Sequence, residues 1–177
     1  MHKILDLGCG TSRVKNSIGV DININNKPDV IHDLNKFPYP FKNSTFTTIY
    51  CNNILFHLND LFKVMEELHR ILEDNGEVIV TSAYFRSPYA YHCPNTKNYF
   101  TVNTFNFFNP NHIFFKKFQY VKIKFDVKKI TFNENFKNNF IKSLVKIMAN
   151  RYPSFYERYF SHIIPLDSVH YYLKKIA

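Results

Sequence analysis

Two observations in the sequence predict an α/β domain built on a mostly parallel sheet. Short apolar runs alternate with turns and helical stretches over the first half of the chain, a pattern typical of buried parallel strands. The five runs span residues 2–7, 18–22, 29–34, 46–52 and 77–84. Between the last two runs, apolar residues recur at helical spacing. A chain of 177 residues is long enough for one full core and too short for two, so we expect one domain over residues 1–177.

The connection between the fourth and fifth runs carries the clearest helix pattern. Its apolar positions are Leu61, Val64, Met65, Leu68, Ile71 and Leu72. Asn59 or Asp60 can cap the start of this helix. Asn75 with Gly76 provides a left-handed stop after it.

The other connections and the second half of the chain show different patterns. The connection over residues 11–17 has room for only about two helical turns. Residues 35–45 hold two prolines, so we expect a surface loop there, called the proline loop below. Residues 87–112 mix proline, asparagine and aromatic residues with little periodicity, which indicates an ordered but irregular covering segment. Residues 118–132 predict a strand with one face in water, and residues 168–176 predict a closing strand.

Positive charge is concentrated in the second half of the chain. Residues 1–100 hold ten basic and ten acidic residues, whereas residues 101–177 hold thirteen and four, so the whole excess of 13 − 4 = +9 lies there. Such a field can attract an anionic partner such as nucleic acid, a phosphorylated metabolite or an acidic lipid surface. A solvated lysine-rich surface explains the same numbers, and the sequence leaves both interpretations open.

Cysteine usage and hydropathy narrow the class of protein. Cys9, Cys51 and Cys93 are odd in number and lack the C-x-x-C spacing of zinc sites and redox pairs, so we expect neither a disulfide nor a metal. No apolar run approaches the roughly 20 residues that span a bilayer, and no leader precedes the first strand. We therefore expect a cytoplasmic protein without an integral membrane segment.

The first strand runs into a turn with two closely spaced glycines. Asp6, Gly8 and Gly10 lie there, and in an open parallel sheet the first such turn is the usual cradle for a ligand. Glycine allows main-chain N–H groups to approach that ligand closely. Asp21 ends the second strand, where it can accept the hydroxyls of a ribose, and Asp33 ends the third, within reach of an adenine amino group. A tight turn and capping acids in a domain that binds no nucleotide, with Asp33 in an Asx turn, is the alternative.

The turn distinguishes between two nucleotide cofactors. A dinucleotide requires a third glycine or alanine in G-x-G-x-x-G, where this chain has Arg13. S-Adenosylmethionine has no phosphate but carries an amino group and a sulfonium, both cationic, which Asp6 can help to hold. The sequence therefore favours S-adenosylmethionine over a nicotinamide cofactor.

An ordered series of motifs resembles a known family. The series consists of "ILDLGCG" at residues 4–10, "GVDI" at 19–22, "HDLNKFPYPFKNSTFTTIYCNNILFHLND" at 32–60 and "LFKVMEELHRILEDNGEVIVTS" at 61–82. It is similar to the class I S-adenosylmethionine-dependent methyltransferases, in particular the type 11 group. The resemblance implies a Rossmann-like seven-stranded mostly parallel sheet with flanking helices, here without the usual N-terminal helices. Residues 1–83 would be the cofactor-binding half, and residues 84–177 the acceptor-side, basic half.

The resemblance also implies a set of site residues. The cofactor-binding set is Asp6, Leu7, Gly8, Cys9, Gly10, Asp21, Ile22, Asp33, Leu34 and Asn52. Asn52 is equally well explained as a turn residue. His57 is the best-placed catalytic base, although a lone histidine is more often structural. Residues that could line an acceptor pocket, or simply pack, are Tyr84, Tyr89, Tyr91, His92 and Tyr99.

Departures from the family leave two functions open. Thr47 stands where members carry an acid, and Phe56 precedes His57 where members often have glutamate. We expect a methyltransferase acting by in-line displacement on a small molecule, a sugar or a lipid. The alternative is a non-catalytic protein of this fold that binds RNA or another polyanion through its basic half.

A basic helix is predicted from Phe136 to Arg151, followed by the aromatic segment "RYPSFYERYF" at residues 151–160. We favour a helix that packs its apolar stripe on the core and leaves its lysines in water. A lid over the acceptor and an interfacial membrane contact are the alternatives.

Overall fold

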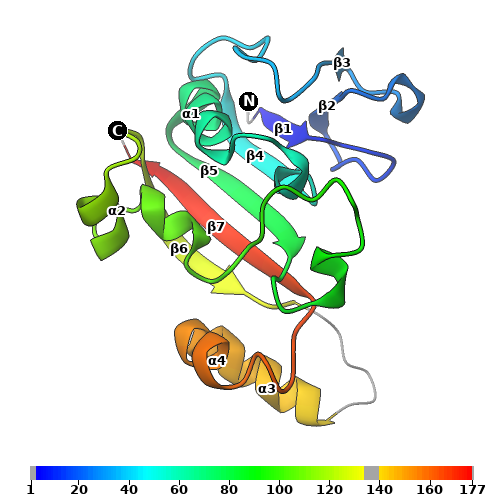
Figure 1. Ribbon diagram of the computed structural model, residues 1–177. Helices are drawn as coiled ribbons and strands as arrows, with labels where there is room; N and C mark the ends of the chain where they lie inside the picture. Colours follow the sequence, from blue (N-terminus) through cyan, green and yellow to red (C-terminus); the bar gives the residue numbers. More distant parts are fainter. Residues whose placement is uncertain (1–2, 134–139, 177) are drawn as a thin grey trace.

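The computed structural model describes residues 3–133 and 140–176. One seven-stranded sheet runs through it, in the order β3-β2-β1-β4-β5-β7-β6 (Figure 1). The strands are β1 Ile4–Leu7, β2 Ser17–Asp21, β3 Val30–Ile31, β4 Phe46–Asn52, β5 Leu72–Ala83, β6 Lys124–Thr131 and β7 Ser168–Ile176. The α-helices are α1 Leu61–Ile71, α2 Ile113–Phe118, α3 Phe140–Arg151 and α4 Pro153–Tyr159. The 3₁₀ helices are η1 Ile24–Asn26, η2 Leu55–His57, η3 Pro88–Ala90 and η4 Thr104–Phe108.

The strand directions confirm the predicted Rossmann-like fold. Strands β3, β2, β1, β4 and β5 are parallel, and only β7 runs antiparallel to its neighbours β5 and β6. The parallel strands end at one edge of the sheet, so the loops that follow β1, β2 and β4 meet there. This edge is where the sequence predicts the cofactor.

Helix α1 confirms the predicted helix but not its predicted stop. Asp60 is the N-cap, and its carboxylate accepts from the N–H of Lys63. The helix ends at Ile71, and Leu72 already has extended geometry and begins β5. Asn75 does adopt a positive φ of 63°, but it does so inside β5, where the ladder to β4 shifts register. The chain therefore leaves the helix before it reaches the predicted stop.

The connections before α1 contain less helix than the sequence predicts. Residues 11–16 form turns rather than two helical turns, and only η1 lies between β2 and β3. Residues 35–45 form the expected loop, with a cis bond before Pro38. Residues 87–112 are irregular apart from η3 and η4, as predicted, and α2 after them was not predicted.

Burial alternates along the central strands. Val78 and Val80 of β5 are fully buried, whereas Ile79 between them is only half-buried, and β4 repeats the pattern at Ile49 and Tyr50. The core therefore lies mainly against one face of these two strands. The first strand differs, because the last three residues of β1 are all buried and it is covered on both faces.

Helices α3 and α4 form a hairpin at one end of the molecule, away from α1 (Figure 1). Its inner side holds Val145, Ala149 and Tyr156, which are buried. The predicted packing of the apolar stripe on the core is wrong, because Leu144 and Ile147 are 50% and 64% exposed. Phe136, where that prediction begins, lies outside the described residues.

The proline loop is fastened to α1 by one arginine. The guanidinium of Arg70 donates to both carboxylate oxygens of Glu67, at 2.8 and 2.7 Å, and to the main-chain oxygens of Tyr39 and Phe41 and the Oδ1 of Asn43. Glu67 also accepts from the N–H of Tyr39, at 2.6 Å. These bonds fix the loop that follows Asp33, and so one wall of the predicted site.

We predict that Arg70→Ala lowers the free energy of unfolding by about 2 kcal/mol, because several half-buried acceptors lose their donor at once. Arg70→Lys should not restore the loss, since an ammonium lacks the planar fork that the acceptors share. Urea denaturation measures both, with Lys63→Ala on the exposed side of α1 as the control. A loss in Arg70→Ala no larger than the control's would contradict this role.

Candidate cofactor site

The turn after β1 is shaped by glycine. Gly8 and Gly10 adopt positive φ values of 70° and 50°. A Cβ atom at Gly8 would lie 2.5 Å from the Cγ1 of Ile54, so the turn packs directly on the segment that leaves β4. A Cβ at Gly10 would meet only the main-chain oxygen of Gly8, at 4.0 Å, which is an ordinary contact. Glycine is thus required at the first position by close packing and at the second chiefly by backbone geometry.

The N–H groups of this turn are already engaged by the protein. Those of Gly8 and Cys9 donate to the carbonyl of Val20, at 2.8 and 3.0 Å, and that of Gly10 donates to the Oδ2 of Asp21 at 2.9 Å. In this structure, therefore, the main-chain N–H groups that the glycines were expected to bring close to a ligand are bonded within the protein at all three positions. A phosphate-binding turn needs such donors free, so the turn suits a ligand without phosphate.

Asp21 is held in place by three protein donors. Besides the bond from Gly10, its carboxylate accepts from the N–H of Asn23 at 2.8 Å and the side chain of Asn26 at 3.1 Å. Burial raises the pKa of Asp21, but the bonds from Asn23, Gly10 and Asn26 together outweigh it and bring the pKa below its usual value. The carboxylate is ionised at neutral pH and keeps acceptor capacity on Oδ1.

Asp6 is almost fully buried at the base of the turn. Its Oδ2 accepts from the N–H of Val14 at 2.7 Å, whereas Oδ1 is buried and has no hydrogen-bond partner among the described residues. Burial is the main reason that the pKa of Asp6 is raised, against the opposing effects of Val14 and the charge of Arg13. An unpaired buried carboxylate oxygen is costly, and a cationic donor from a ligand would relieve that cost.

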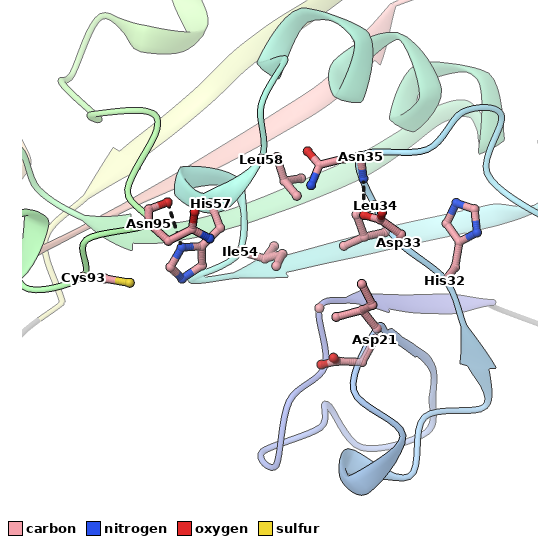
Figure 2. A pocket seen from close by; sticks show the side chains of 12 residues that line it. Asp21, His32, Asp33, Leu34, Asn35, Ile54, His57, Leu58, Cys93 and Asn95 are labelled. Atoms are coloured by element: carbon pink, nitrogen blue, oxygen red, sulfur yellow. Dashed lines mark hydrogen bonds between the residues drawn. The ribbon is translucent and has the colours of Figure 1, made fainter.

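A cavity of about 340 Å³ opens at this edge of the sheet (Figure 2). Its lining is Gly8, Asp21, Ile22, His32, Asp33, Leu34, Asn35, Ile54, His57, Leu58, Cys93 and Asn95. Five predicted cofactor residues are in this lining, Gly8, Asp21, Ile22, Asp33 and Leu34, and so is His57. The other five, Asp6, Leu7, Cys9, Gly10 and Asn52, are not; Leu7 and Cys9 are buried in the fold beneath the turn.

The loop after β3 supplies a second acidic position. Asp33 forms an Asx turn, which is the structural role that the sequence left open for it. Its Oδ1 accepts a hydrogen bond from the N–H of Asn35 at 3.0 Å. Asp33 also lines the cavity, so the same side chain stabilises the turn and faces the site (Figure 2). Ile22, 65% exposed, provides apolar surface on the same cavity. Two acids and apolar walls match the mixed polarity of an adenosine.

His57 lies on η2, at the end of the cavity away from His32 (Figure 2). Its Nδ1 is 3.5 Å from the main-chain oxygen of Asn95, and its ring packs on Phe56. The segment bearing Asn95 is fastened over η2, since the N–H of Lys97 donates to the oxygen of Phe56 at 2.7 Å. The remaining ring nitrogen of His57 can therefore accept or donate a proton on the cavity side.

Sequence reasoning missed part of the lining, namely His32, Asn35, Ile54, Leu58, Cys93 and Asn95. His32 and Asn35 lie within two residues of Asp33 in the motif already quoted. Their closeness to this acid in the sequence could have placed them at the site. Cys93 and Asn95 come from an irregular segment without periodicity. Nothing local in the sequence places that segment over the sheet edge.

A second cavity, of about 320 Å³, lies on the other side of η2. It is lined by Asn53, Phe56, Ala83, Tyr89, Asp167 and Ser168. Of the tyrosines expected at an acceptor pocket, Tyr89 is in this lining. Tyr84 is fully buried in the core, and Tyr91 and Tyr99 are exposed and line neither cavity. Thus η2 separates two cavities, and Phe56 faces the second.

Thr47 is remote from the site. It is the second residue of β4, at the opposite edge of the sheet, where its hydroxyl donates to the oxygen of Lys3 at 3.2 Å. The acid that family members carry at this position would not reach the cavity. The departure at Thr47 therefore leaves the site unchanged.

Comparison with known proteins identifies this architecture. Residues 5–80 match the family model described as a methyltransferase domain. A structure of an S-adenosylmethionine-dependent methyltransferase from Archaeoglobus fulgidus aligns with a TM-score of 0.60 at 17% identity, covering 98% of this chain and 86% of that one. The chain has the class I methyltransferase fold. The resemblance to the type 11 group is confirmed for the matched segment.

Two further structures align with this fold at low identity, and one further protein is similar in sequence. An S-adenosylmethionine-dependent methyltransferase from Mesorhizobium loti aligns with a TM-score of 0.59 at 13% identity, covering 98% of this chain and 90% of that one. The [4+2]-cyclase SpnF aligns with a TM-score of 0.56 at 14% identity, covering 98% and 74%. An uncharacterized protein of Methanocaldococcus jannaschii, MJ0638, is 29% identical over 132 residues, or 63% of this chain and 58% of that protein. The chain thus spans less than two thirds of that relative's length.

We predict that alanine at the two glycines of the turn has unequal effects. Gly8→Ala should lower the free energy of unfolding by about 3 kcal/mol, because a left-handed backbone and a clash with Ile54 add together. Gly10→Ala adds the same methyl group to a left-handed backbone but causes no clash, so it should lower the free energy of unfolding by about 1 kcal/mol. Urea denaturation of the two variants makes the comparison, and equal losses would show that the packing on Ile54 does not constrain the turn.

Proposed function

We propose that the protein is an S-adenosylmethionine-dependent methyltransferase. The observation that carries this proposal is a turn whose N–H groups are engaged internally, next to a buried acid with an unpaired oxygen. That combination suits a cationic ligand without phosphate. The likeness of residues 5–80 to methyltransferase domains supports the same ligand.

The chain's own residues would divide the cofactor between them. Asp21 would accept from ribose hydroxyls through its remaining capacity, and Asp33 with Ile22 would hold the adenine. Asp6, which lies beneath the turn and outside the cavity lining, would stabilise the cationic amino acid end through its charge. The cofactor, once bound, supplies an activated methyl group, so most of the rate would come from positioning and exclusion of water.

The acceptor would enter from the second cavity. Asn53 and Phe56 line that cavity, whereas Ile54 and His57 line the first, so the same short segment faces both. An acceptor there would be a small molecule, a sugar or a lipid of modest size. His57 would take a proton from the acceptor where the reaction requires it.

We predict that calorimetry detects binding of S-adenosylmethionine and S-adenosylhomocysteine, and that Asp21→Asn weakens both roughly tenfold or more, because charge-assisted hydrogen bonds to ribose are lost. Asp126→Asn, a carboxylate on β6 far from the cavity, serves as the matched control. Thermal melts exclude unfolding as the cause.

Absence of heat with either ligand would overturn the proposed function. If RNA then bound tightly, with an affinity falling steeply as salt rises, the non-catalytic alternative would replace it.

We predict that His57→Gln retains the heat of cofactor binding but loses methyl transfer at least tenfold, because a glutamine cannot remove the acceptor's proton. The assay follows a labelled methyl group from S-adenosylmethionine into separate lipid, sugar and polar-metabolite fractions. Transfer at the wild-type rate would remove His57 from the mechanism and leave the cofactor assignment standing.

A further inference from the structure

Helices α3 and α4 and the residues next to α4 expose a set of large apolar side chains, called the hairpin surface below. It consists of Phe140, Ile141, Leu144, Ile147, Tyr152, Phe155, Tyr159 and Ile163. On α3, Phe140, Leu144 and Ile147 follow helical spacing and form one stripe, exposed by 76%, 50% and 64%. Exposed apolar side chains gathered in this way mark an interaction site.

The charge of the hairpin is almost entirely positive. Between Phe140 and Ile163 the chain holds four basic residues, Lys142, Lys146, Arg151 and Arg158, and one acidic residue, Glu157. Glu157 faces inward, so it does not offset the basic residues on the outside. The guanidinium groups of Arg151 and Arg158 lie over the rings of Tyr152 and Tyr159, each 5.4 Å from the ring centroid.

The hairpin is held firmly against the fold rather than hinged. Glu157 accepts from the hydroxyl of Tyr84 at 3.1 Å and from the N–H of Val102 at 2.8 Å. The hydroxyl of Tyr156 accepts from the N–H of Leu166 at 2.8 Å and donates to the oxygen of Ile164 at 3.0 Å. With its buried side fixed in this way, the hairpin is not a lid that closes its apolar stripe over the site.

Three kinds of occupant could cover such a surface. In a second copy of the chain, the basic residues of the two copies would approach each other as apolar contact formed, and like charges disfavour that. RNA would satisfy the arginines and stack on the tyrosines but would gain little from exposed isoleucine and leucine. An anionic bilayer satisfies both sets, since phosphates meet the basic residues while aliphatic side chains enter the acyl boundary.

We propose that the hairpin surface docks the protein on an anionic membrane. Leu144, Ile147 and Phe140 enter the headgroup and acyl boundary, the tyrosines lie at the headgroup level, and Arg151 and Arg158 contact lipid phosphates. No helix among residues 3–133 and 140–176 is long and apolar enough to span a membrane, so contact is confined to the surface. This proposal does not depend on methyl transfer.

Vesicle sedimentation with the full chain tests the proposal. Wild type should sediment with vesicles of phosphatidylcholine and phosphatidylglycerol and much less with phosphatidylcholine alone. Leu144→Ser with Ile147→Ser should lower the partition coefficient at least roughly tenfold, since the main apolar anchors are lost. Arg151→Gln with Arg158→Gln should lower it several-fold and reduce its salt dependence.

Matched controls distinguish the hairpin from other exposed apolar residues. Ile113→Ser on α2, a residue 62% exposed, should leave vesicle binding unchanged. Circular dichroism melts confirm that each variant folds. The proposal would be overturned by no sedimentation of wild type with anionic vesicles at low salt, or by equal binding of the serine double variant. Self-association in sedimentation velocity that the serine double variant abolishes would overturn it in favour of a second copy, and tighter RNA than vesicle binding in favour of RNA.

Discussion

The contact between Gly8 and Ile54 is the constraint on which the candidate site depends. It brings the turn after β1 against the segment that leaves β4, so two strands close one cavity. Because the turn is pressed onto that segment, its N–H groups are directed back to Val20 and Asp21 rather than outward. This packing determines the chemistry of the site. Its acids can contact a ligand, whereas the main-chain N–H groups of the turn already donate to the protein.

The turn is stabilised without the helix that usually follows β1. Arg13 reaches across residues 11–16 to the carboxylate of Asp29 and the oxygen of Ser17. A Cβ at Gly19 would lie 2.9 Å from the Sγ of Cys9, so β2 passes directly beneath the turn. Close packing and one arginine thus replace a helix. Arg13, whose presence in the motif disfavours a dinucleotide, therefore also has a structural role in stabilising the turn.

The sequence was sufficient for the parallel strands and the acids that end them, because strand periodicity and turn chemistry are local. It was insufficient where tertiary packing decides. The stop at Asn75 failed because Leu72 already pairs with Phe46 of β4 and so ends the helix first. The apolar stripe of α3 has the same spacing whether it faces a core or solvent, so Leu144 was misplaced. Asn95 reaches the cavity through an irregular segment that no periodicity could place.

The two halves of the chain are joined physically by the segment after β5. Tyr84 and Val102, at its two ends, both bond to Glu157 on the inner side of the hairpin. Between them, Tyr89 lines the second cavity and Asn95 contacts His57. One ordered segment therefore contacts His57, the second cavity and the hairpin. If the hairpin surface docks on a membrane as proposed, the same bonds to Glu157 hold the lining of the second cavity in a fixed orientation relative to that membrane.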